Sequence, residues 1–250
     1  MLKTLCRISP LVFLLLGLAS PVNADFVGLK AGGGIWDFEP SGTFRYLGGD
    51  IDLKEDLKLK DEQGTFTFIA IEHPIPLIPN IKISKTNLAT TGGGTLTVAY
   101  DFAGTTYSVS DTVETELDLS HSDVTLYYQF LDNIISFDLG LTGKTFDGKA
   151  SVTRAGVTNS TLIDDTIPML YAAVGLTIPV IDIYLGVEGS ALSIGDNSIS
   201  DVTAKISYES DYAVGIEAGV RTISIELDDL DSNYSNMEFS GAFANLFLHF

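Results

Sequence analysis

Hydrophobic and polar residues alternate with a period of two along many short segments of this chain. From Ile134 to Lys144 the odd positions are largely apolar and the even positions polar or small, and the same split recurs at 183–191, 202–208 and 214–221. A strand with one face in lipid and the other in a lumen has this pattern, and so does a strand of a soluble sandwich. The pattern therefore predicts an all-β chain without fixing its environment.

The connections between the predicted strands favour a membrane barrel over a sandwich. Short connections at 74–79, 132–133, 179–180 and 210–211 alternate with long ones near 37–64, 92–113, 148–165 and 228–236. Outer-membrane barrels have short periplasmic turns and longer extracellular loops. We therefore predict one up-and-down antiparallel transmembrane β-barrel of about ten strands, with eight or twelve as alternatives, and expect the long connections to be extracellular. The predicted strands are residues 26–36, 65–73, 80–91, 114–131, 134–147, 167–178, 181–195, 201–209, 212–227 and 237–250.

The N-terminal segment has the layout of a signal peptide. Lys3 and Arg7 precede an apolar run at 11–18, and small and polar residues then lead to Ala24. An uncleaved membrane helix needs roughly 20 apolar residues, and this run is too short. We predict cleavage after Ala24, which removes 1–24 and leaves 25–250 as one domain without its only cysteine, Cys6.

Composition supports a barrel and excludes some partners. The mean hydropathy is +0.26, yet no later stretch is apolar for long enough to be a spanning helix. Because hydrocarbon offers the backbone no hydrogen bonds, a span without helices must be a closed barrel. Loss of Lys3 and Arg7 lowers the basic count from 14 to 12 against 33 acidic residues, a net charge of −21. Nucleic acid is therefore not expected as a partner, and no cofactor is indicated.

The C-terminal segment has the features of a terminal barrel strand. Leu246, Leu248 and Phe250 lie on one face, behind Ala242 and Ala244. This arrangement resembles the terminal strand that the barrel-assembly machinery recognises, so Leu246, Leu248 and Phe250 are the predicted assembly signal. Aromatic residues are expected where strands cross the membrane interface, and the proposed lipid face offers such a girdle near the short connections: Tyr128, Phe130, Phe137, Tyr208 and Phe250.

Several longer motifs resemble a known family. They include the segments 32–36 (GGGIW), 72–81 (EHPIPLIPNI) and 117–123 (LDLSHSD), and the likeness continues over essentially the whole mature chain. The chain is similar to a family of Gram-negative outer-membrane β-barrels of about this length, known mainly from genome sequences and without an established activity. A looser similarity, in size alone, is to small barrels of the outer-membrane protein W type. The resemblance implies the fold and a location among outer-membrane lipid and lipopolysaccharide.

The candidate chemistry lies on the strand faces predicted to point inward. His121 and Asp123 share one face of the predicted strand 114–131, where a carboxylate could orient a histidine base as in barrel hydrolases and acyltransferases. The sequence indicates neither a nucleophile nor a metal site beside them, so a hydrogen-bonded network is the preferred interpretation. The predicted lumen network is Lys30, His121, Asp123, Asp138, Lys144, Glu188, Lys205, Glu217 and Arg221.

From these patterns we predict a non-catalytic barrel for passage or sensing of small solutes, and not an enzyme. Two alternatives stay open: a structural or adhesive surface protein, and an outer-membrane hydrolase or acyltransferase that uses His121 and Asp123. No metal site is predicted in the lumen. The acidic loops, with Asp228, Asp229 and Asp231, are weak candidates for Ca²⁺ or Mg²⁺ because hard cations prefer oxygen ligands.

Overall fold

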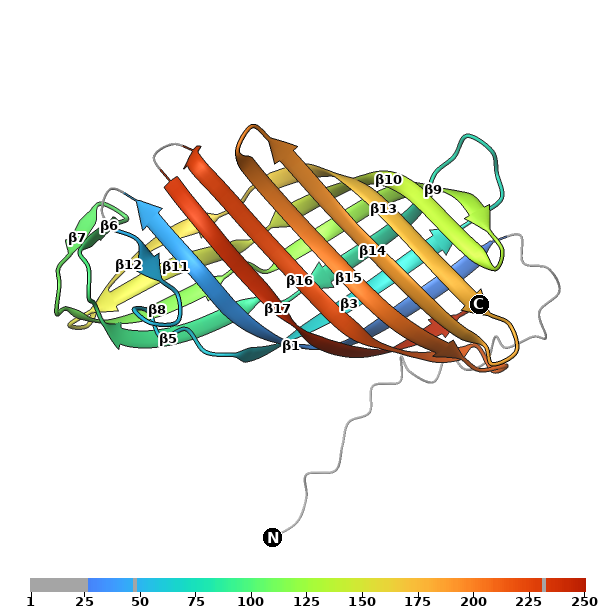
Figure 1. Cartoon of the computed structure of the whole chain (residues 1–250), viewed down its shortest axis with the longest axis horizontal. Coiled ribbons are helices and arrows are strands. Elements are labelled where there is room, and N and C mark those ends of the chain that lie inside the picture. The colour runs from blue at the N-terminus through green and yellow to red at the C-terminus, as the bar shows by residue number, and fades with distance from the viewer. Residues whose placement is uncertain (1–26, 47–48, 231–232) are drawn as a thin grey trace, which may run out of the picture.

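The chain forms a closed antiparallel barrel, shown in a computed structural model that describes residues 27–46, 49–230 and 233–250 (Figure 1). Ten strands in these ranges follow one another around the barrel, and the first also pairs with the last. The predicted fold class and the count of about ten strands are confirmed. The barrel strands are β1 (Gly28–Tyr46), β3 (Glu62–Glu72), β4 (Asn80–Thr86), β9 (His121–Asp132), β10 (Ile135–Phe146), β13 (Thr166–Ile178), β14 (Ile183–Ile194), β15 (Asn197–Glu209), β16 (Val214–Leu230) and β17 (Asn233–His249).

The predicted signal peptide, with its cleavage site at Ala24, lies outside the described residues. Within the described ranges, no helix has the length and hydropathy to cross a membrane.

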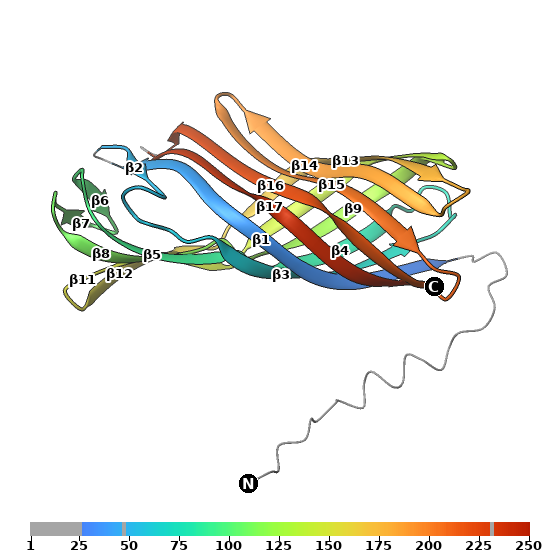
Figure 2. The ribbon, with the colours of Figure 1, turned by 60° about the horizontal axis from the view of Figure 1, so that its bottom comes forward.

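Four barrel strands continue past one end of the barrel as a separate sheet. After one or two residues outside regular structure, β4, β9, β10 and β13 each adjoin a strand of a four-stranded sheet with the order β12-β11-β8-β5. Figures 1 and 2 show this sheet beyond the barrel, at the end opposite the C-terminus. We call the sheet, with β2 and the β6–β7 hairpin, the cap. Its strands are β2 (Ile51–Asp52), β5 (Ala89–Thr95), β6 (Tyr100–Phe102), β7 (Thr105–Tyr107), β8 (Thr112–Asp118), β11 (Gly148–Arg154) and β12 (Val157–Ile163).

Many residues predicted to form long loops are strands instead. The range 148–165 is largely the β11–β12 hairpin, and β1 runs on to Tyr46 through the start of the range 37–64. The range 92–113 contains the small β6–β7 hairpin, which turns at Ala103 and Gly104, both with positive φ. The cap strands have polar residues on both faces, as in the segment 148–161, so they lack the alternation by which the barrel strands were identified.

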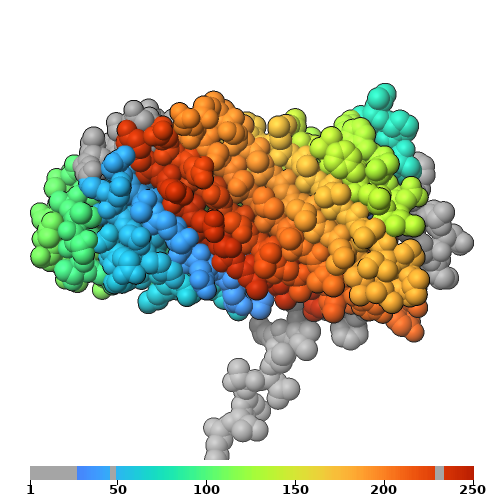
Figure 3. Space-filling model, viewed as in Figure 1, coloured from blue at the N-terminus to red at the C-terminus, as the bar shows by residue number. Residues whose placement is uncertain are grey.

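The faces of the barrel strands match the predicted period of two. On β10, Leu139 and Leu141 are exposed on the outer surface whereas Thr142 and Lys144 are buried inside. Figure 3 shows the continuous outer wall that β1 and β13–β17 make on one face. Apolar side chains outside and polar ones inside are the arrangement that a bilayer requires of a barrel.

The glycines of the 32–36 motif allow β1 and β17 to approach closely where the barrel closes. A Cβ on Gly34 would lie 2.1 Å from the carbonyl oxygen of Ala244. The next inward residue, Trp36, donates from Nε1 to the carbonyl oxygen of Gly241 at 3.3 Å. On β17, Leu246 lies on the outer face, and the Phe250 amide donates to Leu29 at 2.8 Å. The predicted assembly role of Leu246, Leu248 and Phe250 stays a prediction.

Two apolar clusters fill the molecule from the middle of the barrel to the cap. The first, which we call the plug, gathers inward side chains from around the barrel wall: Trp36, Phe38, Leu88, Leu119, Phe146, Met169, Ile199, Ile223, Phe239 and Phe243. The second lies in the cap, and its members are Ile51, Leu53, Leu57, Leu59, Leu96, Tyr100, Phe102, Tyr107, Val113 and Val152. These apolar layers make the half of the lumen next to the cap a packed core.

Candidate functional site

The half of the lumen farther from the cap holds a cavity of about 740 Å³. Exposed residues of the short turns line one end of it, among them Asp132, Asp182 and Asp211. Asp201 and Arg221 line it as well, next to the buried cluster described below. Ten aspartates and glutamates but only four lysines and arginines face the cavity. The site is therefore an acidic chamber that is reached from the end of the barrel with the short turns.

The plug separates this chamber from the cap. Trp36, Ile223 and Phe239 are fully buried. Partly buried apolar residues pack against the plug. Each barrel strand either contains or directly adjoins a residue of the plug or one of these neighbours. These side chains therefore form one apolar layer between the cavity and the cap.

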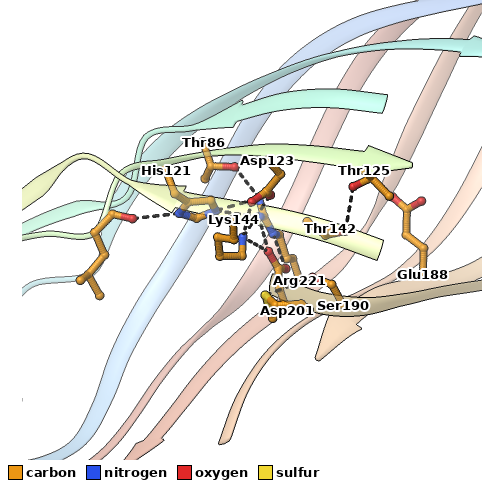
Figure 4. A network of polar contacts seen from close by, with 12 residues as sticks. Thr86, His121, Asp123, Thr125, Thr142, Lys144, Glu188, Ser190, Asp201 and Arg221 are labelled. Carbon is orange, nitrogen blue, oxygen red and sulfur yellow. Dashed lines mark hydrogen bonds and ion pairs between the residues drawn. The ribbon is translucent and has the colours of Figure 1, made fainter. Parts of the chain in front are cut away.

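Five charged or titratable side chains meet beneath the plug, and we call them the inner cluster (Figure 4). Lys144 on β10 is fully buried, and its Nζ lies 3.0 Å from an oxygen of Asp123 on β9 and 3.0 Å from one of Asp201 on β15. A buried ammonium group is stabilised only when its charge is compensated, and two carboxylates do this here. The members of the inner cluster are His121, Asp123, Lys144, Asp201 and Arg221.

Arg221 on β16 fixes the far side of the inner cluster. Its Nε and Nη2 donate to the two oxygens of Asp201 at 2.9 and 2.7 Å, the bidentate geometry that makes such pairs strong. Nη1 donates to Thr86 at 3.0 Å, and the guanidinium lies 5.0 Å from the centre of the Trp36 ring. Arg221 thus joins the polar site to the plug above it.

His121 lies behind the carboxylates and does not line the cavity. Its Nδ1 is 2.9 Å from the carbonyl oxygen of Leu119, so this nitrogen carries a proton and donates it. Its Nε2 then accepts from Arg221 Nη2 at 3.4 Å and lies 4.0 Å from Asp123. His121 and Asp123 do come together as predicted, but the carboxylate, and not the ring, faces the chamber.

The arrangement of ligand atoms resembles a metal site, but the cation in it is Lys144. One ligand atom from each of His121, Asp123 and Asp201 lies within 4.8 Å of the others. The ammonium nitrogen already takes the position between the two carboxylates. The donor set therefore does not fit a metal ion while Lys144 keeps its charge.

A second network, the middle cluster, lies nearer the short turns. Glu188 on β14 accepts from Lys82 at 2.8 Å and lies 3.3 Å from the ammonium of Lys205. Lys205 also pairs with Glu217 at 3.4 Å. Glu217 further accepts from Ser207 at 2.8 Å and from Asn245 at 3.0 Å. The middle cluster balances its charges within itself and leaves room for the cavity beside it.

The predicted lumen network is divided between these clusters. His121, Asp123, Lys144 and Arg221 belong to the inner cluster, and Glu188, Lys205 and Glu217 to the middle cluster. Lys30 instead places its ammonium 3.9 Å from the centre of the Phe247 ring. Asp138 lines the cavity with no hydrogen bond or ion pair among the described residues.

Sequence reasoning missed two charged members. Asp201 shares the inward face of Thr203 and Lys205, one step before the segment whose alternation was analysed. Lys82 was overlooked because the strand 80–91 was not divided into its two faces. The period of two, extended by one position on β15 and applied to β4, places both residues in the lumen.

The loop residues proposed as weak cation ligands do not form a described site. The Asp228 amide donates to Asn197 at 2.9 Å, whereas the side chain of Asp229 and the whole of Asp231 lie outside the described parts. Within those parts, the one group of three metal-ligating residues is His121, Asp123 and Asp201. Ca²⁺ or Mg²⁺ binding at the acidic loops stays a prediction.

The fold and its lumen define a closed, ten-stranded barrel of the outer-membrane type. No family model and no curated protein sequence matches the chain. Among solved structures, it is similar to the outer membrane protease OmpT from Escherichia coli, with a TM-score of 0.50 and 11% identity over 89% of this chain and 97% of the other. The likeness establishes the barrel fold and supports neither the outer-membrane protein W type nor another named family.

These findings correct the two functional predictions. A barrel for the passage of small solutes is contradicted by the plug, which closes the lumen above the cavity. The prediction of a non-catalytic barrel, and hence of no enzyme, is also wrong. The fold is similar to that of the outer membrane protease OmpT, and the lumen brings a histidine and two aspartates together. The findings favour the hydrolase alternative.

Proposed function

We propose that this chain is an outer-membrane β-barrel hydrolase that cleaves an amide or ester bond with water, at the inner end of the lumen cavity. The observation that carries the proposal is the position of Asp123. Its carboxylate lines the cavity, and the Lys144 ammonium lies 3.0 Å from each of its two oxygens and holds it in place. A carboxylate held in this way at the end of an accessible chamber is placed to bind a water molecule and take its proton.

The reaction follows from the groups that reach the chamber. Asp123 accepts a proton from water while the water oxygen bonds to the carbonyl carbon of the substrate. The carbonyl oxygen gains negative charge, and the guanidinium of Arg221, which lines the same cavity, stabilises it. Collapse of the intermediate breaks the bond to the leaving nitrogen or oxygen, which receives the proton from Asp123. Atoms and charge balance without a covalent enzyme intermediate.

The remaining members of the inner cluster act as positioning residues. Lys144 holds Asp123 and Asp201 at 3.0 Å each. Asp201 accepts two hydrogen bonds along one edge of the Arg221 guanidinium, and His121 accepts from a third N–H of the same group. This differs from the arrangement expected from the sequence, in which His121 itself was the base. Preorganised charges of this kind need not rearrange during the reaction.

The similar solved structure supports the proposal of a hydrolase, because the two barrels are similar in fold. OmpT is named an outer membrane protease, so a barrel of this architecture can carry a hydrolytic site. The location is part of the same proposal: export by the segment 1–24, assembly through the C-terminal strand, and residence among the lipid and lipopolysaccharide of a Gram-negative outer membrane. The short turns then face the periplasm, and the substrate enters from that side.

The test is hydrolysis by the refolded barrel in lipid vesicles, measured with a panel of fluorogenic esters, amides and quenched peptides. Asp123→Asn should lower the rate by roughly 10²–10⁴, the usual contribution of a general base. Glu116→Gln in the cap is the matched control, since Glu116 pairs with the half-exposed Lys149 far from the cavity. It should leave the rate unchanged.

Two results would overturn the proposal. One is the absence of cleavage across the panel by a correctly folded wild-type barrel. The other is an Asp123→Asn variant that retains the wild-type rate. If Asp123→Asn does not fold, Asp123→Glu keeps the charge but moves the carboxylate, and an unchanged rate in that variant counts equally against the proposal.

A further inference from the structure

Two side-chain oxygens that line the cavity accept no hydrogen bond. They are Oδ1 of Asp138 and Oδ1 of Asn245, and each atom is buried. Asn245 is only 5% exposed, and its amide nitrogen already donates to Glu217. Buried acceptors normally have a donor. A ligand that fills this chamber is therefore expected to be rich in N–H groups.

The ion pairs account for only part of the negative charge in the cavity. Glu188 and Glu217 pair with lysines of the middle cluster, and Asp123 and Asp201 with Lys144 and Arg221. Glu209 pairs with His249 at the mouth. Asp138 and Glu72 line the cavity without any cation partner among the described residues. Carboxylates that are desolvated and unpaired in this way favour a cationic ligand.

Two tyrosines complete a niche around these carboxylates. The Tyr127 hydroxyl donates to Glu72 at 2.6 Å, and its ring lies 5.7 Å from that of Tyr171. The backbone at Gly140 lies between them in the sheet, because Gly140 is the cross-strand partner of both tyrosines. Asp138 is the next inward residue on β10. Aromatic rings beside carboxylates are the surroundings that bind ammonium groups.

We propose that this niche, formed by Glu72, Tyr127, Asp138 and Tyr171, binds the protonated amine of a small organic ligand. The inference rests on the proposed function in one respect, since it makes the ligand the substrate: an amide or ester that also carries an ammonium group. A hard divalent cation fits less well, because it takes about six oxygen ligands and Glu72 already accepts from Tyr127.

The experiment measures binding and does not depend on turnover. The refolded Asp123→Asn barrel, in an uncharged detergent, is titrated by calorimetry with 1,4-diaminobutane and with 1,4-butanediol, which has a similar length but no charge. The diamine should bind and the diol should not. Asp138→Asn should weaken diamine binding about tenfold or more, because a hydrogen bond to a charged group is lost. Glu116→Gln in the cap is the control and should bind like its parent.

The outcomes separate this inference from the proposed function. Equal binding of diamine and diol, or unchanged binding in Asp138→Asn, overturns the amine niche even if the barrel hydrolyses substrates. Diamine binding in a barrel without hydrolytic activity supports the amine niche and overturns the proposed hydrolase activity. Mg²⁺ that displaces the diamine at equal concentration overturns the assignment to an organic amine. If Asp138→Asn fails to fold, Tyr127→Phe, which releases Glu72, should also weaken binding, and no change would be contrary evidence.

Discussion

Lys144 and Asp123 are cross-strand partners on β10 and β9, and their side chains meet inside the barrel with Nζ 3.0 Å from the carboxylate. The same ammonium reaches Asp201 on β15, a strand that is not adjacent to either. One lysine therefore links opposite parts of the barrel wall beneath the plug.

Lys144→Met should destabilise the barrel by about 3–5 kcal/mol, because it leaves two buried carboxylates without a shared cation. The free energy of unfolding would be measured by urea titration of the barrel in lipid vesicles. Lys149→Met is the matched control: its pair with Glu116 is nearly half-exposed, and such pairs contribute about 0–1 kcal/mol. Equal losses in the two variants would show that the buried pair does not stabilise the fold.

The barrel was predictable from the sequence because one rule, the period of two, applies to every membrane strand. The same rule placed Lys144 and Asp123 inside. It could not identify the plug, since Phe38 and Phe239 are apolar residues on the inward face, where a water-filled lumen was expected. Phe38 also lies beyond the end of the predicted strand 26–36.

Ion-pair partners on distant strands could not be predicted from the sequence either. Alternation fixes which face of a strand a residue occupies, but the stagger between strands sets its height in the barrel. The contact between Asp201 and Lys144 therefore required the three-dimensional structure. The cap was missed for another reason: its strands carry polar residues on both faces, so their sequence pattern is that of a polar loop.

Gly241→Ala should impair barrel closure, because a Cβ at this position would lie 1.7 Å from the carbonyl oxygen of Asp37 on β1. We expect a loss of about 1–3 kcal/mol, as for overpacked sites, and a lower yield of the heat-modifiable folded band on gels. Gly143→Ala on β10 is the control, since a Cβ there meets nothing within 4 Å. It should be neutral or slightly stabilising. Similar folding of both variants would contradict the close β1–β17 contact.

The cap should loosen in acid through Asp111. A hydrogen bond from the Ser108 amide, at 2.8 Å, and the guanidinium of Arg154 lower the pKa of Asp111. A carboxylate with a lowered folded-state pKa stabilises fully above its unfolded pKa of about 3.9 and loses this contribution as the pH falls through the folded value. Amide exchange at Ser108 should therefore rise as the pH falls below about 4, after correction for the intrinsic rate.

The Asp111→Asn variant tests this assignment. It should exchange faster than wild type above pH 5, where the wild-type carboxylate is ionised, and the two should converge in stronger acid. Glu55→Gln, at an exposed pair with Lys58, should change neither curve. A difference between wild type and Asp111→Asn that grows as the pH falls has the opposite sign and would exclude the mechanism.

The plug predicts a barrel that is inserted but does not conduct. In planar bilayers, wild type should show no steady single-channel current, because the plug and the apolar cluster of the cap close the lumen in series. Trp36→Ala should lower the unfolding free energy by roughly 3–5 kcal/mol, since a fully buried aromatic ring is lost. It should still not conduct, because the cap cluster remains intact. Gel mobility before and after heating confirms folding in both samples. Stable openings of the folded wild type would show that the plug does not seal the lumen.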